Sequence, residues 1–153
     1  MSLASVRAFL ATHAPDIRVI ETERSSATVA EAAAAHGVEP ARIAKTLSLS
    51  VGGRTFLVVT RGDTRLDNRK VKAVFGGKAS MLGAEEVQAL TGHPVGGVCP
   101  FGLATPLPVY CDISLKAFEE VVPAAGSVNS AIRIAPARLA ALANADWVDV
   151  CQS

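Results

Sequence analysis

The strongest structural signal in the sequence is a pair of strand-forming runs joined by two glycines. The run RIAKTLSLSV ends at Val51, the run RTFLVVT begins at Arg54, and Gly52 and Gly53 stand between them. Two such runs with a Gly-Gly connection are typical of an antiparallel β-hairpin with a tight turn. The sequence therefore predicts a fold built around a sheet that contains this hairpin.

Helical and strand-forming segments alternate irregularly on both sides of the hairpin. Helices are predicted over residues 5–13, 28–36, 67–75, 83–91, 115–121 and 136–143, and further strands over 17–22, 107–114, 130–135 and 147–151. The helix at 28–36 has a capping-box pattern in Thr28 and Glu31 and a glycine stop at Gly37. This order predicts a single domain, residues 1–153, of the α+β (mixed α/β) class, with one curved mixed sheet and flanking helices.

Composition excludes several broad classes of protein. Half of the 153 residues are hydrophobic and 19% are charged, which is typical of a globular protein. Lys and Arg outnumber Asp and Glu by only 15 to 14, so any nucleic-acid contact must come from a local basic patch. The three cysteines are widely spaced, and no metal-binding cluster, cofactor motif or membrane-spanning stretch occurs. We therefore expect a cytoplasmic protein without disulfides, metal or cofactor.

Lys45 is unusual within the first strand of the hairpin. Period-two alternation places it on the apolar face of the strand, which also contains Ile43, Leu47, Leu49 and Val51. The opposite face contains Ala44, Thr46, Ser48 and Ser50. A lysine near a strand end can run its stem along apolar residues and reach water. It can also place a cation at the rim of a pocket, facing an anionic or carbonyl-bearing ligand, and the pattern leaves both interpretations open.

The positive charge of the chain is concentrated between Arg61 and Lys78. This segment holds six basic and two acidic residues, whereas the rest of the chain is net acidic. Arg65, Arg69 and Lys72 are spaced four and three residues apart, so at helical spacing they form a basic ridge. Such a ridge is either a solvated helix face or a contact for a phosphate backbone. No aromatic residues interleave with it, so base stacking is not indicated there.

The run TGHPVGGVCPFGL, residues 91–103, is too rich in glycine and proline to be a helix or a regular strand. Gly96 and Gly97 allow the backbone to approach a ligand closely, and consecutive N–H groups in such a turn can bind an anion or an oxyanion. The same loop offers Cys99 as a nucleophile with His93 as its base, but their spacing provides no evidence that the two side chains meet. Cys99 is therefore expected to be a small packing residue.

Two further features have both a structural and a functional interpretation. Asp112 ends a predicted strand and can cap the turn that follows it. The run AAGSVNS, residues 124–130, contains Asn129 and is either a plain turn or part of the wall of the same pocket.

Several of these segments together resemble the YbaK/EbsC family of aminoacyl-tRNA deacylases. The runs ATVAEAAAAHGV, RIAKTLSL, RGDTRLDNRKVKAVFG, TGHPVGGVCPFGL, VYCDISL and AAGSVNSAIRI follow one another in this order. The resemblance extends over nearly the whole chain and is most specific at the lysine of AKTL and at the Gly-x-x-x-Pro loop, Gly96 to Pro100. This family in turn resembles the editing domain that is inserted in bacterial prolyl-tRNA synthetases.

The resemblance implies a YbaK-like fold and a free-standing hydrolase of mischarged tRNA. The expected substrate is tRNA for proline carrying a small wrong amino acid, namely alanine, cysteine, serine or 2-aminobutyrate. Catalytic roles fall to Lys45, Gly96 and Gly97, and substrate-binding roles to Val98, Cys99 and Pro100. Asn129 is added to the substrate-binding residues from the loop AAGSVNS, although this loop departs from that of the relatives, which carries glycine and basic residues. The basic ridge, Arg65, Arg69 and Lys72, is expected to hold the acceptor end of the tRNA. Prolyl-tRNA synthetase is a second candidate partner.

Two other functions compete with this one. A non-catalytic module would bind tRNA ends or nucleotides in the same pocket without turnover. A cysteine-dependent hydrolase would act on a small metabolite through Cys99. Because an aminoacyl ester is already activated, positioning a water and stabilising the oxyanion can suffice for its hydrolysis, and no strong nucleophile is required.

Overall fold

The predicted hairpin is present in the computed structural model, which describes residues 2–152 of the chain. Strand β2 (Ile43–Val51) pairs antiparallel with β3 (Arg54–Arg61), and the turn glycines Gly52 and Gly53 have φ of 56° and 81°. β3 pairs in parallel with β5 (Val109–Asp112), and β5 pairs in parallel with β8 (Asp146–Val148). On the outer side of β2 lie two short strands, β4 (Ser80–Met81), which is antiparallel to it, and β6 (Val122–Pro123), which is parallel to it. The predicted fold class, with its mixed sheet, is confirmed.

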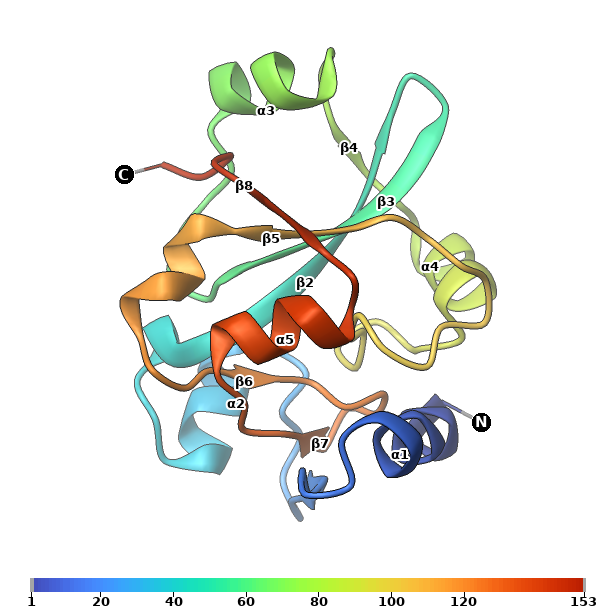
Figure 1. The fold of residues 1–153 in the computed structure, drawn as a ribbon, viewed down its shortest axis with the longest axis vertical. Helices are drawn as coiled ribbons and strands as arrows, with labels where there is room; N and C mark the ends of the chain where they lie inside the picture. Colours follow the sequence, from blue (N-terminus) through green and yellow to red (C-terminus); the bar gives the residue numbers. More distant parts are fainter. Residues whose placement is uncertain (1, 153) are drawn as a thin grey trace.

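Helices cover both faces of this sheet (Figure 1). On one face α3 (Asn68–Phe75) packs Val71 and Phe75 against Leu49, Phe56 and Val58. On the other face α1 (Ser2–His13) and α5 (Pro136–Leu142) enclose the larger core around Leu57, Val59 and Phe101. A smaller core joins α2 (Val29–His36) to Ile43 and to β6.

The remaining elements are a second, two-stranded sheet, a helix and two 3-10 helices. A separate two-stranded ladder joins β1 (Ile20–Glu21) to β7 (Ser130–Ala131). Helix α4 (Ala84–Thr91) precedes the glycine-rich loop, and short 3-10 helices occupy Pro40–Arg42 and Ile113–Ala117. No helix among residues 2–152 combines the length and the apolar character that a membrane span requires.

Most of the predicted helices form, but one prediction is wrong. The segment predicted as a helix over residues 115–121 is a 3-10 helix that ends at Ala117, because Val121 leaves to bridge Ile134 and the next residues pair with β2. The predicted strands at 17–22 and 130–135 shrink to β1 and β7. Their outer residues lie in irregular backbone, which local propensity does not reveal.

Asp112 has a structural role. Its side chain is 1% exposed, and its two carboxylate oxygens accept hydrogen bonds from the backbone N–H groups of Ser114 at 2.9 Å and of Val150 at 2.8 Å. The first bond caps the 3-10 helix, as the sequence suggested, and the second ties down the C-terminal segment. A buried carboxylate with backbone donors on both oxygens is satisfied without a ligand.

Candidate active site

The outer edge of β2 is left open over its middle residues. β6 pairs with β2 at Ile43 and Ala44, and β4 pairs with it at Leu49 and Ser50. Just before β4 begins to pair, the carbonyl of Ser48 accepts a hydrogen bond from the N–H of Leu82 at 3.0 Å. Because backbone groups two residues apart point to the same side of a strand, the N–H and C=O of Thr46 also face this outer edge. The gap between β6 and β4 thus presents a short stretch of unpaired strand.

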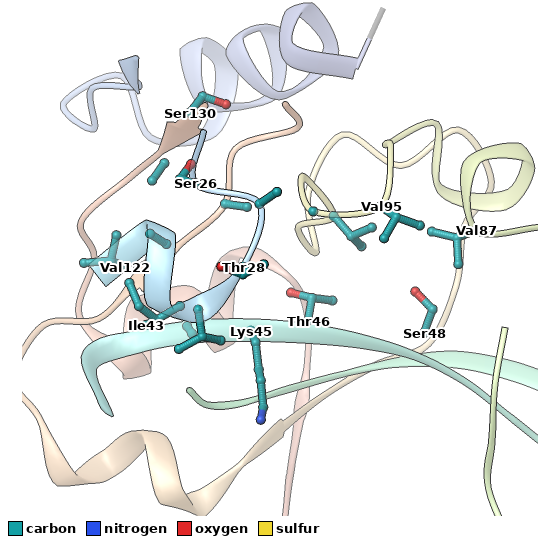
Figure 2. Close-up of a pocket in the computed structure, with 18 of the residues that line it drawn as sticks. Ser26, Thr28, Ile43, Lys45, Thr46, Ser48, Val87, Val95, Val122 and Ser130 are labelled. Atoms are coloured by element: carbon teal, nitrogen blue, oxygen red, sulfur yellow. The ribbon is translucent and has the colours of Figure 1, made fainter. Parts of the chain in front are cut away.

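A cavity of about 210 Å³ lies against this gap (Figure 2). Its walls come from the chain before and within the first turn of α2, from β2, from residues 81–87, from the glycine-rich loop and from β6 and β7. Most of the lining is apolar, and five hydroxyl-bearing residues interrupt it: Ser26, Thr28, Thr46, Ser48 and Ser130. Lys45 is the one ionisable residue among the described residues that line the cavity.

Thr46 has the least satisfied side chain of the cavity wall. Its hydroxyl oxygen is buried and has no hydrogen-bond partner among the described residues. In Figure 2 this side chain lies on the cavity side of β2, together with Ser48. A buried hydroxyl without a hydrogen bond destabilises the folded protein, and a polar ligand that bonds to it would remove this cost. Thr46 is therefore positioned to bind a ligand.

The glycine-rich loop meets the segment before α2 and the loop before β7 at two places where a side chain does not fit. Gly96 has φ of 90°, and a Cβ there would lie 2.7 Å from the Cβ of Ala27. A Cβ on Gly97 would lie 2.7 Å from the backbone carbon of Ser127. These close approaches explain both glycines, and they bring the backbone of Gly96 and Val98 to the cavity wall.

The structure corrects part of the predicted oxyanion site. The N–H of Gly97 donates to the carbonyl of Pro94 at 2.9 Å, so it is not available to a ligand. The N–H groups of Gly96 and Val98 have no acceptor among residues 2–152. The available donors are therefore one residue to either side of Gly97.

Three residues predicted to bind substrate do not line the cavity. Cys99 has no exposed surface and packs in the larger core, and Pro100 is also buried. The amide of Asn129 donates to the carbonyl of Thr22 at 3.0 Å and so fastens β1 to its loop. Of the predicted substrate-binding residues, Val98 lines the cavity, and Ser130 lies there in place of Asn129.

Cys99 does not have the properties of a nucleophile. Its sulfur lies 3.7 Å from Nε2 of His93, so the two side chains do meet. Complete burial raises the pKa of the Cys99 thiol to about 12, a shift that the backbone hydrogen bond with Phe101 only partly opposes. A thiol with this pKa is not a thiolate at neutral pH, which argues against the cysteine-dependent hydrolase.

His93 instead supports the glycine-rich loop from inside. It is fully buried, its Nε2 donates to the carbonyl of Phe101 at 2.8 Å, and its Nδ1 lies 2.7 Å from the hydroxyl of Ser2. Ser5 adds a hydrogen bond of 2.9 Å to the carbonyl of Gly102. Helix α1 is therefore hydrogen-bonded to one side of the glycine-rich loop, and the other side of this loop lines the cavity.

This arrangement predicts a loss of stability in mild acid. Burial lowers the pKa of His93, with a smaller opposing effect of the Phe101 carbonyl, so the folded protein holds the ring neutral. The unfolded chain takes up a proton below pH of about 6.5 and the folded chain does not, so the free energy of unfolding decreases as the pH falls from 7 toward 5.

We expect His93→Gln to cost about 1–3 kcal/mol at pH 7.5 and to flatten this pH dependence, as measured by urea unfolding. His13→Gln, on the exposed end of α1, is the matched control for the substitution itself and should cost little stability at pH 7.5. Burial also lowers the pKa of His36, so the residual slope should disappear in a variant that lacks both buried histidines. An unchanged slope in His93→Gln contradicts the assignment.

Lys45 contributes its backbone to the cavity but not its ammonium group. Figure 2 shows the side chain on the opposite side of β2 from Thr46 and Ser48. There Nζ donates to the carbonyl of Thr64 at 2.6 Å. Burial lowers the pKa of Lys45, nearby Asp63 opposes this shift, and Arg65 adds to it. Of the two interpretations that the sequence left open for Lys45, the cation facing a pocket on its own side of the strand does not fit, because the cavity lies on the other face of β2.

The basic ridge lies on the same side of the sheet as the Lys45 ammonium. Arg65, Arg69 and Lys72 are exposed, and the last two belong to α3, which packs on the face opposite the cavity. The open edge of β2 separates these cations from the cavity. The arrangement is thus a small uncharged cavity on one side of a strand and a group of cations on the other.

Together, the mixed sheet, the cavity beside an open strand edge and the Gly-x-x-x-Pro loop define a site for a small ligand, with a mostly apolar lining in which hydroxyl and backbone groups supply the polar contacts. The family model of the aminoacyl-tRNA editing domain matches residues 23–142. The chain belongs to this family.

Relatives along the whole chain and along parts of it agree with this assignment. The chain is 48% identical to YwhH of Bacillus subtilis (strain 168), a protein of uncharacterised function, over 99% of this chain and 98% of YwhH. It is 30% identical to EbsC of Enterococcus faecalis, proposed as a Cys-tRNA(Pro)/Cys-tRNA(Cys) deacylase, over 85% of this chain and 79% of EbsC. It is 38% identical to the proline–tRNA ligase of Solidesulfovibrio magneticus over 67% of this chain but only 18% of the ligase.

A solved structure shows the same fold. A protein proposed as a trans-editing enzyme for prolyl tRNA synthetase superimposes with a TM-score of 0.90 and 35% sequence identity, over 99% of this chain and 98% of that one. The resemblance to a YbaK-like editing domain that the sequence indicated is confirmed.

Sequence reasoning missed most of the cavity wall. The hydroxyls of Thr46 and Ser48 had a signal, because alternation placed them together on a polar face of a strand whose other face is apolar. Met81 and Val95 had none, since they lie far apart in the sequence and meet at the cavity only through the fold.

Proposed function

We propose that this protein hydrolyses the ester bond of a mischarged aminoacyl-tRNA. The observation that carries the proposal is the small uncharged cavity next to the unbonded N–H groups of Gly96 and Val98, in a chain of the editing-domain family. The favoured substrate is tRNA for proline that carries alanine, cysteine, serine or 2-aminobutyrate. Because tRNA is charged in the cytoplasm, the protein is expected to act there.

The chemistry needs no ionisable group in the cavity. A water molecule attacks the ester carbonyl carbon, the carbon–oxygen bond to the terminal ribose breaks, and the proton released by the water goes to the ribose oxygen, which leaves as a hydroxyl. The backbone N–H of Gly96 or Val98 donates to the oxyanion that forms, while the neighbouring ribose hydroxyl helps to orient the water. One such preorganised donor contributes about 10²–10³ in rate.

The cavity wall accounts for the preference for a small amino acid. Its volume of about 210 Å³ has to hold the aminoacyl group together with the attacking water. The unpaired hydroxyl of Thr46 and its outward-facing carbonyl are acceptors for the amino acid's ammonium group. One methylene in an apolar pocket is worth only about 1–3 kcal/mol, so the active site of a synthetase discriminates poorly between amino acids of similar size. A separate small site that hydrolyses the wrong product adds the missing discrimination.

In this proposal the cations behind β2 hold the nucleic acid. An ammonium group has three N–H donors, and one N–H of Lys45 donates to the carbonyl of Thr64. The others remain for a phosphate of the acceptor end, whose aminoacyl group reaches the cavity over the open edge of β2. Arg65, Arg69 and Lys72 extend this positive surface, and prolyl-tRNA synthetase is the candidate source of the mischarged tRNA.

A deacylation screen tests the proposal. Purified protein is incubated with tRNA for proline charged with alanine, cysteine, serine, 2-aminobutyrate or proline, and the remaining ester is measured over time. We expect at least one small amino acid to be released well above the uncatalysed rate, and proline to be retained. Binding of the charged tRNAs without release of any of them would favour the non-catalytic module instead.

A further inference from the structure

Two exposed apolar side chains flank the mouth of the cavity. Met81 is 63% exposed and Val95 is 58% exposed, and both line the cavity. Met81 comes from the edge strand β4 and Val95 from the turn that leads into Gly96. The fold does not require either side chain, because each has more than half of its surface in solvent.

An exposed methionine on an edge strand is a liability unless it has a ligand. Edge strands of soluble proteins usually carry polar or charged residues that prevent pairing with another chain. On this edge both residues are exposed, and Ser80 is polar while the apolar Met81 lines the cavity. Lys78, three residues earlier on the same segment, is exposed and has no ion-pair partner among the described residues. The segment therefore combines an apolar contact with an unpaired cation, which suits a nucleotide better than an apolar protein surface.

The substrate dictates what these side chains meet, and this step rests on the proposed function. An aminoacyl group in the cavity is esterified to the terminal ribose, so that ribose must lie at the cavity mouth. The base on the same ribose then lies within one sugar ring of the mouth, where Met81 and Val95 stand. A nucleobase offers two flat faces, and a polarisable thioether and a branched aliphatic side chain pack well against such a face.

We propose that Met81 and Val95 form a lip that stacks on the terminal nucleobase of the acceptor strand. The lip holds the ribose so that the ester carbonyl enters the cavity beside Gly96. A thioether packed on an aromatic ring contributes up to about 1.5 kcal/mol, so loss of one side of the lip should reduce kcat/KM by up to about tenfold.

A double-mutant cycle between the side chain and the base tests the lip. Met81→Ala and Val95→Ala are compared with the unsubstituted protein on two minihelix substrates that carry the best amino acid of the screen, one ending in adenosine and one ending in an abasic ribose. We expect each substitution to lower kcat/KM by up to about tenfold on the adenosine substrate and to have little effect on the abasic one. Val74→Ala, at a 43% exposed apolar residue on α3, is the matched control and should change neither.

Other outcomes separate the lip from the proposed function. An equal loss on both substrates would make Met81 a cavity wall only and would overturn the lip, as would no loss on either. A parallel arm measures binding of the uncharged minihelices with and without the terminal base. One combination of results would support the lip and refute the proposed hydrolase. In it, the unsubstituted protein releases no amino acid, and Met81→Ala weakens binding of the minihelix that has the terminal base but not of the minihelix that lacks it.

Discussion

Lys45→Ala is expected to lower kcat/KM for deacylation by about 100-fold while leaving the fold intact. In the proposed complex the ammonium donates to a phosphate of the acceptor end, and a charge-assisted hydrogen bond of this kind is worth up to about 3 kcal/mol. The cost to stability should be small, since the substitution removes one hydrogen bond to Thr64 and also the unfavourable burial of a charge. The loss should appear mainly in KM, because the ammonium group does not reach the cavity in which the ester reacts.

Salt dependence distinguishes this role from a structural one. A phosphate contact releases a counterion, so the logarithm of kcat/KM should depend less steeply on the logarithm of salt concentration in Lys45→Ala, by about 0.7 in slope for one phosphate of a single strand. Lys45→Arg keeps the charge and should retain most of the activity and the original slope. Lys45→Met keeps the apolar stem and should behave like the alanine variant.

Full activity of Lys45→Ala, or an unchanged salt slope despite lost activity, would refute the phosphate contact. If only stability falls, the lysine serves to hold the turn at Thr64 against β2. That result would leave the cavity and its loop as the whole of the site.

The fold was accessible from the sequence where local signals were strong. The hairpin, the capped helices and the mixed class followed from alternation, glycine turns and helix caps, because these depend on neighbours in the chain. The short strands β1, β4, β6 and β7 could not be predicted in this way. They consist of two residues each, and their pairing partners lie at distant positions along the chain.

For the site, too, features set by neighbouring residues could be predicted, and features set by the packing of distant segments could not. Alternation correctly separated Lys45 from Thr46, but it could not tell which face of β2 borders a cavity, since that depends on where α2 and α3 pack. The sequence drew attention to the loop glycines, and Gly96 does line the cavity, yet only the hydrogen bond from Gly97 to Pro94 reveals that the unbonded N–H groups are those of Gly96 and Val98. Cys99, predicted to bind substrate, is buried in the core and does not line the cavity, because tertiary packing, which a sequence does not display, decides the exposure of a loop side chain.

Gly96→Ala should reduce deacylation by about 100-fold for a reason that lies in the backbone. Alanine at φ of 90° is strained, and its Cβ would lie 2.7 Å from the Cβ of Ala27, a distance that real Cβ atoms do not reach. The loop must therefore move away from the start of α2. Such a movement displaces the N–H of Gly96 from the position where it meets the oxyanion, and loss of one such donor costs about 10²–10³ in kcat.

Gly76→Ala provides a control for the strain alone. Gly76 ends α3 with φ of 83°, and a Cβ there would have no atom within 4 Å. Both variants should lose about 1–2 kcal/mol of stability from the left-handed backbone, and Gly96→Ala should lose more because of the contact with Ala27. Only Gly96→Ala should lose activity when both are assayed well below their unfolding temperatures. If the two variants deacylate tRNA equally well, the N–H of Gly96 does not stabilise the reaction, and the unbonded N–H of Val98 remains as the donor at the cavity wall.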